Sequence, residues 1–516
     1  MPTESKREIW LSLILIITLG FVVYANSLDG EFIWDDEYLI IGNPHIKTLS
    51  GITDVFTKDI GAGAGHQFNF YRPLQMLTYM IDNALWGLNT LGYHLSSVIL
   101  HVLVALSLYW LVLILFKDSV LSLLTSILFV VHPVHTEAVS YISGRSDPLS
   151  LCFLLLCFVF YIKNLDRPNF CFYLAMIAAF ICAVLSKENA LILPILVLLY
   201  HYSFKRRLIL KQFLPLLLLT CFYSLLRMTV FDLRVPGNIP ISSLAQRLPG
   251  AFVAIMQYAR ILIFPFDLHM EYGNKFFAFT DSKALVGMLI VLSCLTYVLA
   301  NRHKRGLIFF GLLWFFIALL PVSNLFPINA YMAEHWLYLP SIGIFLIAAR
   351  GLKNIYDKGL KDVFIVVLAG VLIFYSTLTI MQNRYWQSQI NFYQRTLHFS
   401  PRSIRMHNGL GFAYYRAGRQ QEAIAAFKWA TKVFPKEALL YNNLGAVYYS
   451  LGKAEPAMSM FYKAVELDPG YAEAYSNLAL VYFKDKNYKL AIENCDKAKE
   501  AGLINQELID KLKEYR

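Results

Sequence analysis

Residues 94–116 read HLSSVILHVLVALSLYWLVLILF, a run without any Asp, Glu, Lys or Arg. A helix of about 20 apolar residues is long enough to cross the roughly 30 Å hydrocarbon core of a bilayer. We therefore predict a polytopic, all-α membrane domain with about eleven transmembrane helices. The other ten apolar runs lie at residues 10–25, 119–135, 148–163, 169–186, 188–204, 212–230, 284–300, 306–321, 335–350 and 362–381.

The composition of the 516 residues agrees with a membrane protein. Hydrophobic residues make up 57% and charged residues 16%, whereas soluble domains contain about 45–50% apolar and 25% charged residues. This excludes an ordinary soluble enzyme and a disordered chain. The net charge of +11 comes mostly from basic residues in short loops between the apolar runs, which is the positive-inside pattern. We therefore expect no nucleic-acid partner.

The basic loops also predict the orientation of the chain. Lys6 and Arg7 precede the first run, which places the N-terminus in the cytoplasm. Eleven spans then place the C-terminus outside, in the periplasm of a bacterial inner (plasma) membrane or in the lumen of the endoplasmic reticulum. Residues 26–93 form the first external loop. We interpret the apolar stretch 249–265 as an interfacial or re-entrant helix on the external side.

A different pattern begins at about residue 404, where charges become frequent and a 34-residue period appears. The period is typical of tetratricopeptide repeats, whose helix pairs stack into an α-solenoid that binds peptides or partner helices. We predict a transmembrane domain at 1–385, a linker helix at 386–403, and three repeats with a capping helix at 404–516. Equivalent positions are Leu410, Leu444 and Leu478, Tyr414, Tyr448 and Tyr482, and Ala423, Ala457 and Ala491.

Ionisable side chains gather at the predicted external ends of many spans. Such groups are costly near a bilayer unless they are paired or functional. A transporter would concentrate them near the midplane, so this pattern favours an active site at the external water–lipid boundary. The candidate residues are Asp35, Asp36, Glu37, Arg72, His132, His135, Glu137, Arg145, Asp147, Lys187, Glu188, Glu334 and His335.

Several of these groups allow two interpretations. Three adjacent carboxylates at 35–37 raise at least one pKa and suit a general base or a metal ligand, but they also suit an acidic first helical turn. Arg72 could hold a phosphate with two hydrogen bonds or could reach from the bilayer edge into water. His132, His135 and Glu137 could bind a metal, although their spacing matches no known zinc motif.

Six motifs carry a family resemblance that covers nearly the whole chain. They are YRPL at 71–74, HPVHTEAV at 132–139, GRSD at 144–147, SKE at 186–188, PVSN at 321–324 and EHWLYLPS at 334–341. With the C-terminal repeats, their order resembles that of the transmembrane and tetratricopeptide-repeat-containing (TMTC) proteins. That family is similar to GT-C glycosyltransferases, and its eukaryotic members are O-mannosyltransferases that use dolichyl-phosphate mannose.

The resemblance implies a sugar transfer from a polyprenyl-phosphate donor to an acceptor hydroxyl, with inversion, and no nucleotide. It places the catalytic carboxylate at Asp35 or Asp36, and the repeats would hold a protein acceptor. Candidate ligands of the donor phosphate are Arg72, Arg145, Lys187 and His335. The sugar pocket, or a divalent metal if one is needed, would involve Glu37, His132, His135, Glu137, Asp147, Glu188 and Glu334.

Two motifs depart from the family pattern. The usual Gly-Arg-Ala-Asp is GRSD at 144–147, and the usual Ala-Glu-Arg is Ala-Glu-His at 333–335. His335 would then contact the donor with a pH-dependent charge. The short repeat tail suggests a prokaryotic relative, so mannose is one possible sugar among others.

Two functions of other classes stay open at this point. The chain could be a non-catalytic membrane scaffold whose repeats recruit partners, or it could polymerise or ligate lipid-linked glycans. A scaffold would keep its function after removal of the Asp35 and Asp36 carboxylates. A polymerase or ligase would use a glycan as its acceptor.

Overall fold

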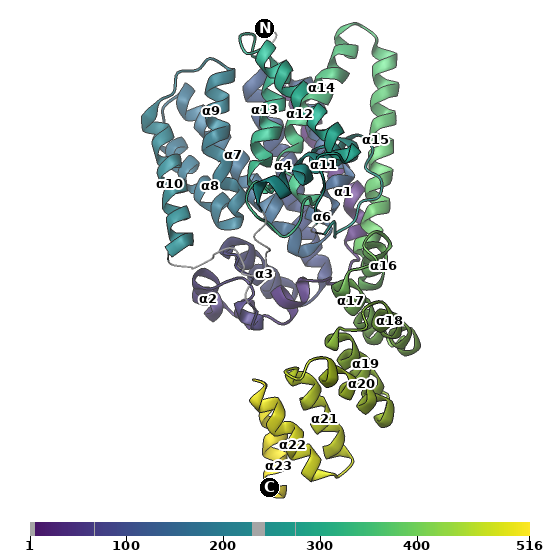
Figure 1. Cartoon of the computed structure of the whole chain (residues 1–516). Coiled ribbons are helices and arrows are strands. Elements are labelled where there is room, and N and C mark those ends of the chain that lie inside the picture. Colours follow the sequence, from purple (N-terminus) through teal and green to yellow (C-terminus); the bar gives the residue numbers. More distant parts are fainter. Residues whose placement is uncertain (1–5, 67, 230–242, 274) are drawn as a thin grey trace. The chain divides into compact units, whose positions relative to one another are not determined.

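The computed structural model describes residues 6–66, 68–229, 243–273 and 275–516, and all regular structure in these ranges is helical (Figure 1). The chain divides into two compact units, Met1–Ser388 and Gln389–Arg516. The first contains α1 (Lys6–Tyr24), α2 (Ile52–Thr57), α3 (Pro73–Trp86), α4 (Thr90–Phe116), α5 (Ser119–Val131), α6 (Thr136–Val139), α7 (Ser146–Asp166), α8 (Phe170–Ser186), α9 (Leu193–Ser203), α10 (Leu210–Thr229), α11 (Leu244–Ile263), α12 (Ser282–Ala300), α13 (Leu307–Leu319), α14 (Ser341–Asp357) and α15 (Lys361–Asn383). The second contains α16 (Gln389–Phe399), α17 (Ile404–Arg416), α18 (Gln420–Val433), α19 (Ala438–Ser450), α20 (Ala454–Leu467), α21 (Ala472–Lys484), α22 (Tyr488–Glu500) and α23 (Gln506–Leu512).

The first unit has the long apolar helices of a multi-pass membrane protein. Among the described residues, six helical segments are long and apolar enough to cross a bilayer, and a bent pair formed by α5 and Pro133–Val139 would make seven. These six contain α1, α4, α7, α10, α12 and α15. The larger number of eleven spans, and their orientation, stay predictions.

Three predicted spans are broken where they approach the candidate residues. The run 119–135 ends as a helix at Val131, because His132 is extended and Pro133 begins a new short turn at an angle of 56°. The run 188–204 starts with a 3₁₀ turn, which leaves α9 with 11 residues, or about 17 Å. The run 335–350 begins with a 3₁₀ turn at His335–Leu337 and is α-helical only from Ser341 onward, in α14.

The helices of the bundle pack around one apolar core, and some approach each other very closely. Gly311 of α13 faces Gly343 of α14, and a Cβ added at Gly343 would lie 2.2 Å from the Gly311 carbonyl oxygen. Small residues at such crossings allow close backbone contact, which is the usual way that helices pack in membranes. The predicted re-entrant stretch 249–265 lies in α11, which packs in the same way on Gly287 of α12. Its position in the membrane stays a prediction.

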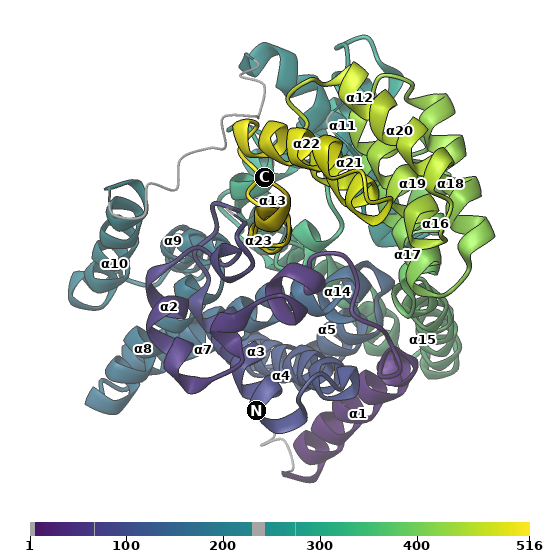
Figure 2. The same cartoon turned by 90° about the horizontal axis from the view of Figure 1, so that it is seen from below.

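The predicted first loop is folded around its own small core. Phe32, Ile40, Ile46, Val55 and Tyr79 are buried there together. The core joins the segment after α1 to α2, α3 and the first turn of α4. Figures 1 and 2 show α2 and α3 lying across one end of the helix bundle. This folded loop positions the residues of the candidate site.

The second unit is a stack of helical hairpins, as the 34-residue period predicts. The small residues Ala423, Ala457 and Ala491 are all fully buried between helices. The turns within the hairpins repeat as well, because Gly418 and Gly452 both have a φ of +72°. Figure 2 shows α18 to α22 following one another in the stack.

Candidate functional site

The acidic segment after α1 separates two neighbouring aspartates into different environments. Asp35 is partly exposed, and its backbone N–H donates to the Tyr141 hydroxyl at 3.2 Å. Asp36 is 1% exposed. Trp34, the preceding residue, has a φ of +56°, and such strained backbone is often found at functional sites. Glu37 is partly exposed and begins a π-helical turn, Glu37–Ile41.

Hydrogen bonds hold both carboxylate oxygens of Asp36. The Ile33 N–H donates to one oxygen at 2.9 Å, and the N–H of Ser143 donates to the other at 2.9 Å. The Ser143 hydroxyl also donates to that second oxygen. Burial raises the pKa of Asp36 to about 7, against the opposing effect of these donors, and the charge of Asp35 raises it slightly. The carboxyl whose pKa rises is therefore Asp36, and the main cause is burial.

The segment 137–147, from α6 to the start of α7, contacts several of the candidate residues. Glu137 meets His335, and Tyr141 and Ser143 meet the acidic segment. Further along, Arg145 pairs with Asp82, and Asp147 pairs with Lys187. A single short segment thus joins side chains from the first loop, α3, the end of α8 and the segment before α14.

Arg145 is enclosed and has many partners. Its side chain is 0% exposed and donates to Asp82, to the Tyr93 carbonyl at 2.6 Å and to the Ser97 hydroxyl at 3.2 Å. The guanidinium also lies over the Tyr79 ring at 4.9 Å. A cation that is buried and paired in this way fixes α3, α4 and α7 relative to one another.

A second cationic group lies around Glu188. Arg72 donates to both oxygens of the Glu188 carboxylate, at 3.1 and 2.8 Å, and Arg227 of α10 approaches the same carboxylate at 3.8 Å. The neighbouring Lys187 pairs with Asp147 at 2.7 Å. The three cations exceed the two carboxylates by one positive charge, and both arginines keep some exposure.

The adjacent residues Glu334 and His335, of which His335 departs from the family motif, have different partners in the fold. His335 Nδ1 contacts Glu137 at 2.6 Å, and its backbone N–H donates to the same carboxylate at 3.0 Å. Its side chain is 25% exposed. Glu334 is buried and accepts from the His269 N–H and the Tyr272 hydroxyl, both at 2.6 Å.

The candidate metal ligands do not form a metal site. His132 is buried with its ring nitrogens next to the Leu262 carbonyl and the Val134 N–H, and Glu137 is occupied by His335. His135 is buried against the Phe129 ring. Among the described residues, no three His, Cys, Asp or Glu side chains are close enough to hold a metal ion.

Several partners in these groups were not predicted from the sequence. They are Asp82, Tyr141, Ser143, Arg227, His269 and Tyr272. Asp82 left a signal, because it is the only charged residue of helix α3. The other residues carry no such signal in the sequence, because only the folded chain brings them to their partners.

Comparison with known proteins supports the resemblance along most of the chain. A protein O-mannosyl-transferase of Caenorhabditis elegans is 27% identical over 84% of this chain and 64% of its own length. Human proteins named protein O-mannosyl-transferase TMTC1 and TMTC4 are each 26% identical over 82% of this chain, and over 55% and 66% of their lengths. The chain therefore spans about half to two thirds of these relatives.

The C-terminal unit also matches models of a repeat family. Tetratricopeptide-repeat family models match residues 408–472 and 460–493. Among solved structures, the repeat protein YrrB is 19% identical, covers 34% of this chain and 89% of its own, and has a TM-score of 0.22, which is too low to support any functional statement. Along most of its length the chain is therefore similar to the TMTC proteins, and it is a multi-pass membrane protein with C-terminal tetratricopeptide repeats.

Proposed function

We propose that the chain is a membrane glycosyltransferase that moves a sugar from a polyprenyl-phosphate donor to a hydroxyl of a protein acceptor. The principal support is the different environment of the two aspartates. Asp35 is partly exposed, whereas both oxygens of Asp36 accept hydrogen bonds from Ile33 and Ser143. The names of the relatives as protein O-mannosyl-transferases agree with this function.

In the proposed reaction, Asp35 is the general base. The acceptor oxygen attacks the anomeric carbon, and the bond between that carbon and the donor phosphate oxygen breaks. The phosphate leaves with the electron pair, and the hydroxyl proton passes to Asp35. General-base catalysis of this kind contributes about 10²–10⁴-fold. Inversion at the anomeric carbon is expected from the family resemblance.

Asp36 is a positioning residue in this mechanism. It ties the acidic segment to Ser143 and thereby holds Asp35 beside Tyr141. A carboxyl with a pKa near 7 is largely neutral below that pH, so it does not add a second full negative charge beside the base. The repulsion that three adjacent ionised carboxylates would create is thereby reduced.

The leaving phosphate needs positive charge, and the group around Glu188 can supply it. Arg72 and Arg227 share a single carboxylate, so one arginine can turn to the phosphate while the other keeps Glu188 paired. Preorganised cations of this kind stabilise charge that develops in the transition state. Arg145 is fully buried with Asp82, so we propose that it positions α7 and does not bind the donor.

His335 can contact the donor through one ring nitrogen. Glu137 engages Nδ1, which fixes the orientation of the ring and leaves Nε2 for a donor oxygen. The family has an arginine at this position. Its guanidinium can form two hydrogen bonds with the lipid-linked sugar, whereas the imidazole of His335 can form one. We propose that His335 contributes to selection of the donor headgroup.

The repeats would hold the acceptor. A stack of tetratricopeptide hairpins provides a surface for an extended peptide. Tethering this surface to the catalytic unit raises the effective concentration of a bound acceptor near Asp35. This part of the proposal rests on the repeat fold and on the family matches to residues 408–493.

The test is sugar transfer by the purified full chain in detergent, with a panel of synthetic polyprenyl-phosphate sugars and a hydroxyl-containing peptide mixture. Asp35→Asn should lower turnover about 10²–10⁴-fold, with binding of the donor retained. Asp36→Asn should lose less activity, because the amide oxygen still accepts a hydrogen bond. Asp54→Asn is the matched control, because Asp54 is an exposed acid of the same loop that pairs with Lys58.

The outcomes separate the candidate functions. Equal turnover by wild type and Asp35→Asn would refute the assignment of the base. A folded protein that binds no donor in the panel would favour the scaffold function. Transfer to a lipid-linked glycan but to no peptide would favour a polymerase or ligase.

A further inference from the structure

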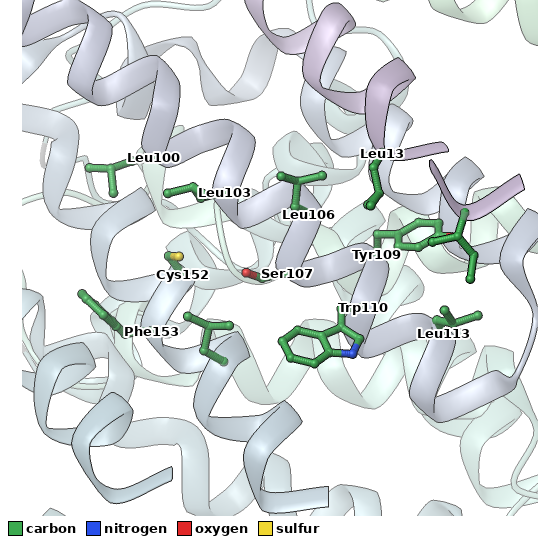
Figure 3. Close-up of a pocket in the computed structure, with 12 residues that line it drawn as sticks. Leu13, Leu100, Leu103, Leu106, Ser107, Tyr109, Trp110, Leu113, Cys152 and Phe153 are labelled. Atoms are coloured by element: carbon green, nitrogen blue, oxygen red, sulfur yellow. The ribbon is translucent and has the colours of Figure 1, made fainter. Parts of the chain in front are cut away.

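A groove runs between α1, α4 and α7. Its volume is about 650 Å³, and it is lined by Leu13 of α1, by Leu103, Leu106 and Trp110 of α4, and by Phe153 of α7, among others. Figure 3 shows these side chains around one space. None of the candidate catalytic or donor-binding residues lines it.

The lining suits a hydrocarbon chain. The lining side chains are almost all apolar, and Leu103 is 42% exposed on a helix that belongs to a candidate membrane span. Along α4 the lining extends from Leu100 to Leu113, which is about 20 Å at 1.5 Å per residue. One leaflet of a bilayer has about 15 Å of hydrocarbon, so a single lipid chain can lie along the groove.

Basic residues lie beyond the apolar lining residues at one end of the groove. Residues three, four and seven positions apart share a face of a helix. By this spacing Lys6, three residues before Ile9, shares its face of α1, and Lys163, seven residues after Leu156, shares its face of α7. Lys117 directly follows the last residue of α4, four positions after Leu113. The Lys163 ammonium lies 4.3 Å from the centre of the Trp110 ring, and Trp110 itself lines the groove.

The acidic residues near these lysines are mostly engaged elsewhere. Asp118 pairs with Lys353 at 3.3 Å, and Asp166 pairs with Arg206 at 3.3 Å. In the first turn of α1, the formal charge of Glu8 is balanced by that of Arg7, so Lys6 remains as net positive charge there. The end of the groove therefore keeps an excess of positive charge, which attracts an anionic headgroup.

The position of the lysines excludes the glycosyl donor as the occupant. Lys6 lies at the start of α1 and Lys117 at the end of α4, whereas the loop with Asp35 joins the opposite ends of these two helices. α4 has 27 residues and is therefore about 40 Å long. A phosphate at the lysines would lie on the other membrane face from the proposed sugar transfer.

We propose that this groove binds one acyl chain of an anionic glycerophospholipid, with the headgroup phosphate at Lys163. The bound lipid would fill the space between α1 and the α4–α7 pair. Because α1 leads into the Asp35 loop and α7 begins at the Arg145 segment, such a lipid would stabilise the arrangement of both. The inference does not depend on the proposed sugar transfer.

The test is native mass spectrometry of the full chain, released from nanodiscs of phosphatidylcholine alone or with phosphatidylglycerol. Wild type should retain one phosphatidylglycerol in preference to phosphatidylcholine. Lys163→Gln should weaken this retention about fivefold, the effect of one basic residue at an anionic surface. Leu106→Trp fills the groove and should abolish retention of either lipid. Leu100→Phe is a milder substitution, to be used if that variant does not fold.

Two matched controls keep the test specific. Leu292→Trp adds the same ring at an exposed leucine of α12, and Lys361→Gln removes an exposed lysine at the start of α15; both should bind lipid as wild type does. Equal retention of the two lipids would overturn the anionic headgroup site. Retention that survives both groove-filling substitutions, or a lipid-free dimer, would overturn the groove as the binding site.

Discussion

The two units of the chain use charged side chains in opposite ways. In the membrane unit, Arg145–Asp82 and Lys187–Asp147 are buried and join residues that are 63 and 40 positions apart. In the repeat unit, Arg419–Glu422 and Lys497–Glu493 are about half exposed and join residues three or four positions apart on one helix. Buried pairs carry a large desolvation cost, whereas exposed pairs contribute little to stability. The charges of the membrane unit therefore indicate positioning and chemistry, and those of the repeats indicate a solvated helix surface.

Breaking a buried pair should have the largest effect on stability. We expect Arg145→Met to lower the free energy of unfolding by about 3–5 kcal/mol, because Asp82 is then a buried charge without its partner. The measurement is denaturation of the purified protein in mixed micelles. The double variant Arg145→Met/Asp82→Leu should recover much of the loss, since it leaves no unpaired charge. A loss below about 1 kcal/mol would mean that the pair behaves like an exposed one.

Titration of Asp36 should produce the next largest effect. Its pKa of about 7 in the fold lies above the ordinary value of 3.8, so the folded state binds this proton more tightly than the unfolded state. The stabilising contribution is complete below pH 4 and is lost as the pH rises to about 7. We expect the stability of wild type relative to Asp36→Asn to fall between pH 4 and pH 7. An equal dependence on pH in both proteins would contradict this assignment.

The matched control for this titration has the opposite sign. Asp54 is exposed, and its hydrogen bond from Lys58 lowers the pKa of the Asp54 carboxyl below its ordinary value. Wild type should therefore not lose stability relative to Asp54→Asn as the pH rises. The comparison separates the effect of burial at Asp36 from a general response of the loop to pH.

The outcome at particular residues shows what the sequence could predict. The apolar runs and the 34-residue period depend on local spacing, so they predicted the helices and the repeats that the family models match. Within the predicted spans, the α-helix is interrupted at His132-Pro133 and at 188–192, where the chain forms 3₁₀ turns. Hydropathy averaged over a whole apolar run does not reveal such breaks in the helix.

The sequence supplied candidate residues for the site but not their pairs. Span ends rich in charge predicted Arg72, Glu188 and His335 as members of one membrane face. Their partners follow from tertiary structure, because Arg72 and Glu188 are 116 residues apart and His335 and Glu137 are 198 apart. Spacing carries no information on such contacts. For the same reason the sequence could not distinguish the partly exposed Asp35 from the buried Asp36.

A turn in the repeats gives a prediction of moderate size. Gly418 and Gly452 have a φ of +72°, and the equivalent residue of the third repeat is Lys486, with a φ of +60°. Left-handed backbone costs a residue with a Cβ about 1 kcal/mol relative to glycine. We expect Gly452→Ala to destabilise the repeat unit by about 1 kcal/mol and Lys486→Gly to stabilise it by a similar amount. Changes of the same sign in both variants, measured by thermal unfolding, would contradict the assignment of strain to this turn.

The smallest effect should come from an exposed pair of the repeats. Lys497 contacts Glu493 at 2.7 Å one turn away on α22, and both side chains are about half exposed. Pairs of this type stabilise a helix by about 0.3–0.5 kcal/mol and are screened by salt. We expect Lys497→Gln to change stability by no more than this, and the change should disappear at high ionic strength. Arg145→Met should instead keep its effect in salt, because a buried pair is screened much less. If salt reduced both effects equally, the distinction between the buried charges of the membrane unit and the solvated charges of the repeats would fail.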